Sequence, residues 1–150
     1  MVKRQIEKLR DIEGLYHKPE WYRPLLYGKH IYMNVTYLLP GVEMTMGSQR
    51  EKEAEKIERA VFMLSGELEL TVNEEKFAIK PETAFLVPRE FAGPYIVKNV
   101  GDKTARFMVV MSPPPHPELK TENRHQIIKR YLANNRPVKF AVEMQEFEDS

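Results

Sequence analysis

A dense run of charged side chains stands directly before an apolar segment near the middle of the chain. Residues 50–59 read REKEAEKIER, and residues 60–64 read AVFML. Two carboxylates at Glu53 and Glu55 could bind a metal ion or act as general bases. The guanidinium of Arg59 could instead bind a carboxylate or a phosphate through paired hydrogen bonds. Because a mixed charge run is also typical of a solvated loop, all three interpretations stay open.

The other side chains that could do chemistry are scattered along the chain. There are no cysteines, which excludes disulfides, zinc–thiolate sites and thiol nucleophiles. The four histidines are isolated, without His-x-His or His-x3-His spacing. Only His30 directly precedes a predicted strand, so it is the one histidine kept as a candidate site residue. No phosphate-binding glycine motif and no Gly-x-Ser-x-Gly motif occurs.

The segments that must position these residues read as short strands. Over residues 67–72, leucine and valine alternate with glutamate and threonine, so one face is buried and the other wet. Turn residues occupy 40–41, 73–75 and 100–103. Many short strands about ten residues apart, with no helices between them, indicate an antiparallel sandwich or barrel. We predict strands at residues 31–39, 59–64, 68–72, 77–79, 84–87, 95–99 and 104–111.

Both ends of the chain carry apolar residues outside this block. Residues 2–13 predict a short amphipathic helix, and the proline-interrupted aromatic segment 15–30 predicts an irregular stretch across a hydrophobic surface. The prolines of 112–117 end the strands, after which 121–134 predict a helix and 138–144 an amphipathic strand. We therefore predict three parts, an N-terminal extension at 1–30, a barrel at 31–113 and a C-terminal extension at 114–150.

The composition excludes several classes of function. Of 150 residues, 42% are apolar and 30% are charged, which suits one ordinary globular domain. The 23 basic and 22 acidic residues leave a net charge of +1, so nothing drives the chain toward nucleic acid or anionic membranes. The N-terminus is charged throughout, and no apolar run is long enough to span a membrane. We therefore expect a cytoplasmic protein without nucleic-acid or membrane partners.

The strand pattern and one spaced motif resemble the cupin family, whose members are small antiparallel β-barrels of the jelly-roll type. The likeness covers about half of the chain. The first cupin motif runs Gly, five residues, His-x-His, three or four residues, Glu, six residues, Gly. This sequence keeps that frame between Gly47 and Gly66 without gaps, but Glu53, Glu55 and Arg59 stand at the three metal-ligand positions.

The second cupin motif is also altered. It runs Gly, five residues, Pro-x-Gly, two residues, His, three residues, Asn. Pro88 and Asn99 are retained but stand two residues too far apart, so the histidine position falls on Tyr95 or on Gly93. The hydroxyl of Tyr95 could hydrogen-bond a ligand, or the ring could simply fill the barrel.

The resemblance therefore implies the fold of a metal-binding family without its ligand set. Arg59 stays protonated and has no usable lone pair. At about 4 Å and an effective dielectric near 20, its repulsion of a divalent ion is on the order of 8 kcal/mol. We therefore predict no metal and no cofactor. Strand alternation places Arg59, Val61 and Met63 on one face, which the family frame makes the barrel interior.

These observations predict a cupin-fold protein that binds a small polar or anionic metabolite. The ligand-binding candidates are Arg59, Tyr95, Glu53, Glu55 and His30, and no catalytic residue is assigned. Alternation lets about half of the candidate apolar wall residues face inward. Those candidates are Phe62, Met63, Phe85, Met108 and Met111.

Three alternatives stay open. Residues 57–99 also resemble the metal-lacking half of the bicupin aminohydrolases that act on ureidoglycine. That likeness implies isomerase, hydrolase or lyase chemistry, with Glu53 or Glu55 as general base. A different set, such as Glu51, Glu58 and His30, could assemble an unorthodox metal site. The barrel could also serve only as an oligomerisation unit with a vestigial pocket.

We also expect a homodimer. The final strand and the N-terminal aromatic segment carry apolar faces larger than one small barrel can cover. Cupins commonly dimerise through such extensions, and a two-fold dimer is the ordinary arrangement.

Overall fold

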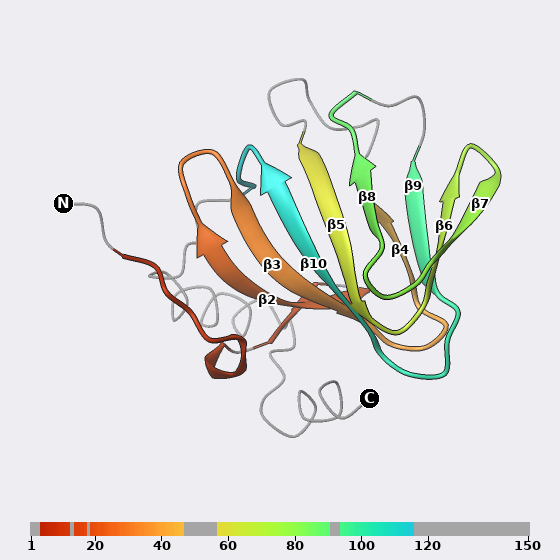
Figure 1. Ribbon diagram of the computed structural model, residues 1–150, viewed down its shortest axis with the longest axis horizontal. Coiled ribbons are helices and arrows are strands. Elements are labelled where there is room, and N and C mark those ends of the chain that lie inside the picture. The colour runs from red at the N-terminus through yellow and green to blue at the C-terminus, as the bar shows by residue number, and fades with distance from the viewer. Residues whose placement is uncertain (1–3, 13, 18, 47–56, 91–93, 116–150) are drawn as a thin grey trace.

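Antiparallel strands make up almost all of the regular secondary structure of the described residues (Figure 1). The computed structural model describes residues 4–12, 14–17, 19–46, 57–90 and 94–115. The strands are β1 (Leu15–His17), β2 (Glu20–Tyr27), β3 (Tyr32–Leu38), β4 (Glu43–Met46), β5 (Glu58–Ser65), β6 (Leu68–Val72), β7 (Glu75–Ile79), β8 (Ala84–Val87), β9 (Tyr95–Asn99) and β10 (Ala105–Ser112).

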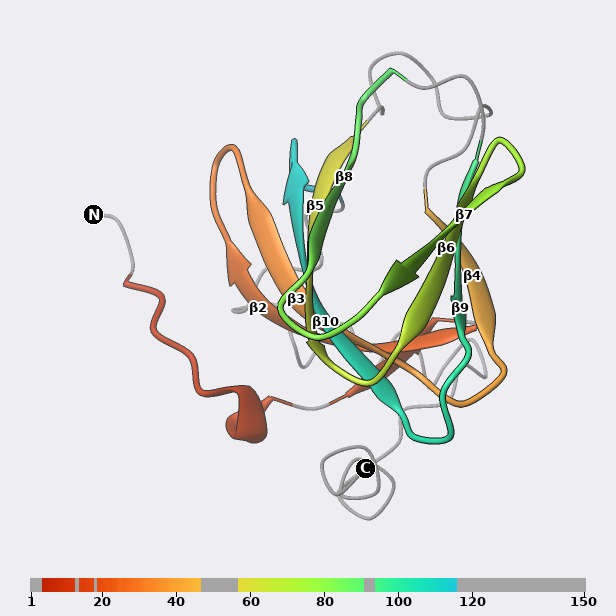
Figure 2. The same ribbon diagram turned by 45° about the vertical axis from the view of Figure 1, so that its right-hand side comes forward.

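These strands form two sheets that face each other. The larger sheet has the order β1-β2-β3-β10-β5-β8, and the smaller has the order β4-β9-β6-β7. Every pair of neighbouring strands is antiparallel. Figure 2 shows the two sheets converging toward one end of the molecule and diverging toward the other. The all-β jelly-roll barrel expected from the sequence is therefore confirmed.

The hydrophobic core lies between the two sheets. The strands β3 to β10 contribute residues to it from one face only, because successive side chains of a strand point to opposite faces. On β5, Val61 and Met63 are buried, whereas Phe62 and Leu64 between them are exposed. The buried core residues are Leu38, Met46, Val61, Met63, Leu68, Leu70, Ile79, Val87, Val97, Ala105, Phe107 and Val109.

One end of the barrel is closed by a buried asparagine, and we call it the closed end. Asn99 is 1% exposed at the end of β9. Its Nδ2 donates to the carbonyls of Leu38 (2.9 Å) and Lys103 (2.8 Å), and its Oδ1 accepts the N–H of Gly101 (2.9 Å). One side chain thus ties the end of β3 to the turn between β9 and β10.

A glycine at the same end allows two strands to approach closely. Gly66 lies between β5 and β6 with a φ of 85°, in the left-handed region that favours glycine. A Cβ at this position would lie 2.8 Å from the Cα of Ala105 and 3.1 Å from the carbonyl oxygen of Thr104. Steric contacts therefore explain why glycine is required at this position, which is the last glycine of the first cupin motif.

The helix predicted over residues 2–13 is wrong for the described part of that segment. It contains only one 3-10 turn, Leu9–Asp11. Gln5 exchanges two hydrogen bonds of 2.8 Å with the backbone of Tyr27, and Arg23 Nη1 donates to the carbonyl of Leu9 at 3.1 Å. These contacts tie the segment along β2, and Lys8 and Ile12 on either side of the turn are extended, so no helix forms.

The prediction that residues 15–30 are irregular is also wrong. They form β1 and β2, and β2 pairs with β3 in the larger sheet. Proline is tolerated in β2 because β1 pairs only with residues 20–22, and the pairing with β3 shifts register between Pro24 and Leu26.

The strands predicted within residues 31–111 are confirmed. The turn predicted at 73–75 is the hairpin between β6 and β7, in which Asn73 and Glu74 both have positive φ, as a type I′ turn requires. The strand β4 was not predicted. The helix expected at 121–134 and the strand at 138–144 lie outside the described residues, and the division of the chain at 30 and 113 remains a prediction.

Candidate functional site

The candidate site lies at the end of the barrel opposite Asn99, which we call the open end. Strands β4 and β8 finish there at Met46 and Val87, and β5 and β9 begin there at Glu58 and Tyr95. The positions that hold metal ligands in the cupin frame all belong to this end or to the segments that connect to it.

Arg59 occupies the inner face of the larger sheet at the open end. It is half-buried and follows the same alternation as the buried residues Val61 and Met63. Its neighbours in register are Met111 on β10 and Val87 on β8. The expectation that Arg59, Val61 and Met63 share the inward face is therefore confirmed.

The guanidinium of Arg59 lies close to the backbone of its own strand. Its Nη1 donates to the carbonyl of Ile57 at 3.1 Å. A guanidinium has five N–H donors in a planar fork, so it can bind several partners at once. A half-buried cation among apolar neighbours such as Met111 and Val87 favours an anion beside it, because desolvated charge needs compensation.

Tyr95 stands at the open end of the smaller sheet. It is the first residue of β9, it is half-buried, and its ring packs against the hydrophobic core. Its neighbours in register are Met46 on β4 and Val72 on β6. Tyr95 and Arg59 therefore belong to opposing sheets at the same end of the barrel.

A row of buried polar side chains on β3 was missed by the sequence reasoning. Thr36 Oγ1 donates to Asn34 Oδ1 at 2.8 Å, and Asn34 Nδ2 donates to the hydroxyl of Tyr32 at 3.3 Å. All three are less than 5% exposed, and they lie on the same inward face of β3 as Leu38. Their alternation as Tyr-x-Asn-x-Thr places them on one face of the strand but does not indicate that this face points inward.

This polar row reaches the same level as Arg59. Tyr32 is in register with Met111, and Met111 is in register with Arg59. A single line across the sheet therefore runs from Tyr32 through Met111 to Arg59 and Val87 at the open end. The open end therefore brings a cation and apolar residues together, with the buried Tyr32 in the same row.

The remaining candidates are placed as follows. Glu53 and Glu55 lie outside the described residues, so their roles remain predictions. His30 is exposed in the bend between β2 and β3, on the open end. Glu58 is exposed and belongs to the outward phase of β5, opposite to that of Arg59. The unorthodox metal set that included Glu58 would therefore need a carboxylate that faces away from the barrel interior.

The predicted apolar wall is about half right, as alternation required. Met63 is buried in the core, and Phe85 and Met111 pack against it. Phe62 and Met108 are direct neighbours in register on β5 and β10, but they belong to the outward phase of their strands.

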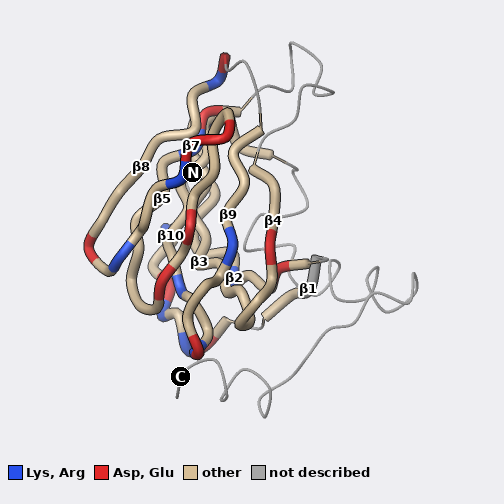
Figure 3. Tube along the Cα trace, turned by 90° about the vertical axis from the view of Figure 1, so that its right-hand side faces the viewer, with Lys and Arg blue, Asp and Glu red and all other residues tan. Residues whose placement is uncertain are grey.

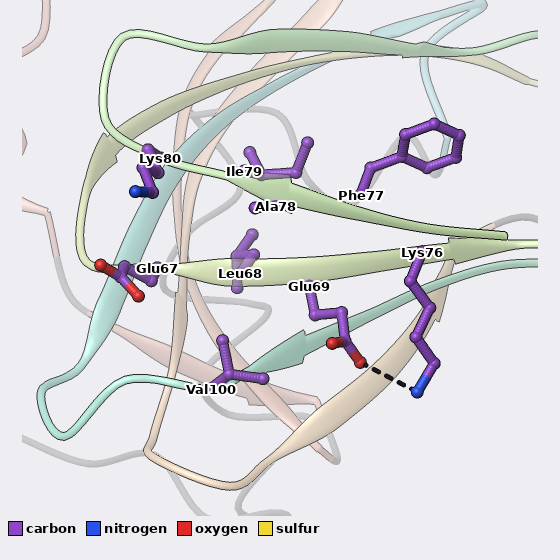
Figure 4. A pocket seen from close by; sticks show the side chains of 9 residues that line it. All are labelled: Glu67, Leu68, Glu69, Lys76, Phe77, Ala78, Ile79, Lys80 and Val100. Atoms are coloured by element: carbon purple, nitrogen blue, oxygen red, sulfur yellow. Dashed lines mark ion pairs between the residues drawn. The ribbon is translucent and has the colours of Figure 1, made fainter.

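A surface hollow of about 170 Å³ lies away from these residues, along the hairpin of β6 and β7 (Figure 4). Its lining includes the ion pair between Lys76 Nζ and Glu69 Oε1, which are 3.6 Å apart and well exposed. Neither Arg59 nor Tyr95 contributes to it. An exposed pair of this kind offers little to orient a ligand, so the hollow is a weaker candidate than the open end.

The residues at the open end do not fit the metal centre that the cupin frame implies. A transition ion there needs neutral imidazoles and a carboxylate that converge on one point. The structure instead directs the Arg59 cation inward from the glutamate position, and the described segments 4–46 and 57–115 with their gaps contain no cluster of three acidic or histidine ligands. The chemistry of the donor set therefore favours an anion.

The fold and the position of these residues define a small jelly-roll barrel with a polar open end. The sequence model of the cupin domain family (Cupin_2) matches residues 42–111. Over these residues the chain is a domain of the cupin superfamily.

Solved structures share this fold at low sequence identity. An RmlC-like cupin from Shewanella frigidimarina is 10% identical with a TM-score of 0.61, over 75% of this chain and 93% of that one. Ectoine synthase from P. lautus is 15% identical with a TM-score of 0.60, over 91% and 93% of the two chains. A predicted oxalate decarboxylase from Thermotoga maritima is 15% identical with a TM-score of 0.59, over 71% and 97%. At these identities, the likeness shows the fold alone.

No curated protein matches the sequence. In the part of the chain that the structure describes, no helix combines the length and the apolar character that crossing a membrane requires.

Proposed function

We propose that this cupin binds a small polar or anionic metabolite at the open end of its barrel, with Arg59 in place of the usual metal centre. The proposal rests on one observation: Arg59 takes the glutamate position of the first cupin motif and belongs to the inward-facing residues of β5. An inward guanidinium offers fixed positive charge and directional donors, which suit a carboxylate or a phosphate.

The surroundings of Arg59 support a small ligand with an apolar part. Met111 and Val87 flank Arg59 in register, and Tyr95 packs on the core from the opposing sheet. The hydroxyl of Tyr32 ends the buried polar row on β3 at the same level. Ligand sites are mostly apolar with a few oriented polar groups, and this arrangement has that character.

Enzymatic activity has no comparable support. The general-base candidates Glu53 and Glu55 lie outside the described residues. The ectoine synthase and the predicted oxalate decarboxylase among the structural neighbours share the fold at 15% identity, and this likeness does not extend to their reactions. The isomerase, hydrolase or lyase alternative therefore remains a prediction from sequence.

The test measures binding of small anions to the full chain. Inorganic phosphate, oxalate and succinate are titrated by calorimetry and by thermal shift, and succinamide serves as the uncharged analogue of succinate. We expect at least one anion to bind and succinamide to bind at least tenfold more weakly. We expect Arg59→Ala to lower the affinity for that anion at least about tenfold, because a hydrogen bond to a charged group contributes about 1.5–3 kcal/mol.

The matched control is Arg10→Ala, which removes an exposed guanidinium from the 3-10 turn of the N-terminal segment. It should leave anion affinity unchanged. The proposal fails if none of the three anions binds at 10 mM, or if Arg59→Ala binds them as well as the unchanged chain. A loss of several kcal/mol of stability in Arg59→Ala without any effect on binding would show that Arg59 is a structural ion-pair partner.

A further inference from the structure

The charges on the outer face of the smaller sheet compensate one another. Glu43, Lys98 and Glu69 stand in one register row across β4, β9 and β6, so the charges alternate in sign. Figure 3 shows part of this alternation as blue on β9 beside red on β4. A face of this kind is satisfied by water and by its own charges, so it offers little to an added ion.

The outer face of the larger sheet carries a cation in different surroundings. Arg106 on β10 points outward, because the residues on either side of it are buried in the core. Its direct neighbours in register are Ser65 on β5 and Tyr37 on β3. The next row along these strands holds Phe62, Met108 and Val35. None of these neighbours is acidic, so the adjoining rows bring no negative charge to Arg106.

An aromatic ring holds the guanidinium of Arg106 in place. Its Cζ lies 5.8 Å from the ring centroid of Tyr37, and the Cζ of Arg23 lies 5.6 Å from the same centroid. The two arginines approach from opposite sides, because β10 and β2 flank β3 in the sheet (Figure 1). Tyr37 is fully buried, and Arg23 is 4% exposed. A cation that is ordered before binding loses little entropy when a ligand arrives.

A β-bulge brings a hydroxyl to the same face. Val61 and Met63 point inward, so strict alternation would point Ser65 inward as well. The pairing of β5 with β10 shifts register at this point, so that Phe107 lies opposite Met63 and Arg106 lies opposite Ser65. Residues directly opposite each other share one face of a sheet. The bulge therefore turns Ser65 toward the outer face beside Arg106, as bulges commonly do.

The polar atoms of this pair are buried without hydrogen bonds. Within the described residues, neither Nε of Arg106 nor Oγ of Ser65 has a hydrogen-bond partner. The two residues as a whole are only half-buried, so the pair borders solvent and is not sealed in the core. Buried polar groups are nearly always satisfied, because leaving one unpaired costs stability. Two unsatisfied groups side by side therefore indicate that a further group binds to them.

We propose that Arg106 and Ser65 form a second anion site, outside the barrel near its closed end, for a small oxyanion such as a phosphate or a carboxylate. Nε and one Nη of a guanidinium make a fork that matches two oxygens of such an anion. The hydroxyl of Ser65 supplies a third donor. The outward side chains of Phe62 and Met108 in the next row offer an apolar surface to the rest of the ligand.

This site is separate from the open end. Met111, the register partner of Arg59, stands five residues along β10 from Arg106, a span of roughly 16 Å at about 3.3 Å per residue. Arg59 also points to the inner face of the sheet, whereas Arg106 points to the outer face. The inference therefore does not depend on what the open end binds.

The first test follows the Nε–H group of Arg106 by NMR of the full chain labelled with nitrogen-15. Arg106→Lys identifies the signal by its loss. Inorganic phosphate, succinate and the uncharged succinamide are titrated to about 20 mM. We expect phosphate or succinate to shift the Arg106 signal to saturation, and succinamide to leave it in place. The Nε–H of the exposed Arg10 is the matched control, and it should need at least about tenfold more anion.

The second test removes the hydroxyl. In Ser65→Ala, the anion concentration at the midpoint of the Arg106 shift should rise about five- to tenfold, because a hydrogen bond to a charged group is lost. Thr45→Val is the matched control, since it removes an exposed hydroxyl from β4 on the smaller sheet, and it should have no effect. Circular dichroism and thermal unfolding show whether each variant is folded. Ser65→Ala decides the question if Arg106→Lys does not fold, and sequential assignment then identifies the Arg106 signal.

Three outcomes would overturn the inference. Arg106 would respond only at the anion concentrations at which Arg10 does, which would make it an ordinary surface charge. Ser65→Ala would leave the titration unchanged. Replacement of Glu146, Glu148 and Asp149 by their amides would shift the Arg106 signal without added anion, because carboxylates of the chain itself would then occupy the site.

Arg59→Ala separates this inference from the function proposed for the open end. The titration of Arg106 should be the same in Arg59→Ala as in the unchanged chain. If anions still shift Arg106 but Arg59→Ala binds them as well as before by calorimetry, the open-end proposal fails and the outer site stands. If Arg59→Ala abolishes the response of Arg106, the two residues do not form separate sites and the inference fails.

Discussion

The two ends of the barrel keep different parts of the cupin sequence frame. At the closed end, Gly66 and Asn99 stand where the frame requires them, and each has a steric or hydrogen-bonding reason to remain. At the open end, the first motif keeps its spacing and the second is two residues longer. Arg59 and, counted back from Asn99, Tyr95 occupy positions that hold metal ligands in the cupin motifs. The closed end keeps residues that stabilise the barrel, whereas the side chains at the open end can be replaced.

This difference shows that the cupin frame combines two separate requirements. Gly66 has a φ of 85°, and a Cβ added to it would lie 2.8 Å from the Cα of Ala105. It therefore cannot be replaced without a shift of the backbone. An inward side chain at the open end has room to change, because only its size and its charge compensation are constrained. Recognition of a fold from such a motif is therefore safer than recognition of its chemistry.

The largest effect is expected for Gly66→Ala. Positive φ and the contact with the Cα of Ala105 combine, so the variant should lose about 4 kcal/mol of unfolding free energy. Chemical denaturation at one fixed protein concentration measures this loss, because any dimer makes stability depend on concentration.

Gly41→Ala is the matched control for this prediction. Gly41 has a φ of 78° but nothing lies within 4 Å of its missing Cβ, so only the backbone penalty of about 1–2 kcal/mol applies. Equal losses in the two variants would mean that the close approach to β10 contributes nothing.

The next effect in size is expected for Asn99→Ala. It removes three hydrogen bonds from the closed end and should cost about 3 kcal/mol, a fall in Tm of roughly 6–12 °C. Asn99→Asp keeps the acceptor for Gly101 but loses both donors, so it should be destabilised at least as much. Near-normal Tm in both variants would refute the view that Asn99 holds this end closed.

The smallest effect on stability is expected for Tyr95→Phe. The ring keeps its packing against the core, so stability should change by less than about 1 kcal/mol, whereas affinity for the anion found with the unchanged chain should fall roughly two- to tenfold. Thermal unfolding and calorimetry separate the two readouts. A loss as large as that of Asn99→Ala would break the contrast between the ends.

Most of the fold could be predicted from the sequence because its signals are local. The strands β8 and β9 match the predicted ranges residue for residue, since alternation, Pro88 and the 100–103 turn lie beside them in the chain. The N-terminal segment could not be predicted in the same way. Its three-residue apolar spacing favours a helix, and only the distant partners Tyr27 and Arg23 hold it extended.

The candidate site was predictable where alternation alone decides it. The phase of Arg59 follows from Val61 and Met63, but the polar row of Tyr32, Asn34 and Thr36 does not follow from β3. Alternating polar residues ordinarily indicate a solvent face. On β3 they face inward, because the N-terminal segment covers the other face of the strand. The sequence of β3 alone does not show that this other face is covered.

The edges of the sheets limit how copies of this protein can assemble. β7 is the last strand of the smaller sheet, and Lys76 and Lys80 are exposed along it. β8 ends the larger sheet after four residues and is followed by Pro88, which has no N–H to offer. Charge, shortness and proline all oppose the addition of a foreign strand. A second chain is therefore poorly placed to extend either sheet at β7 or at β8.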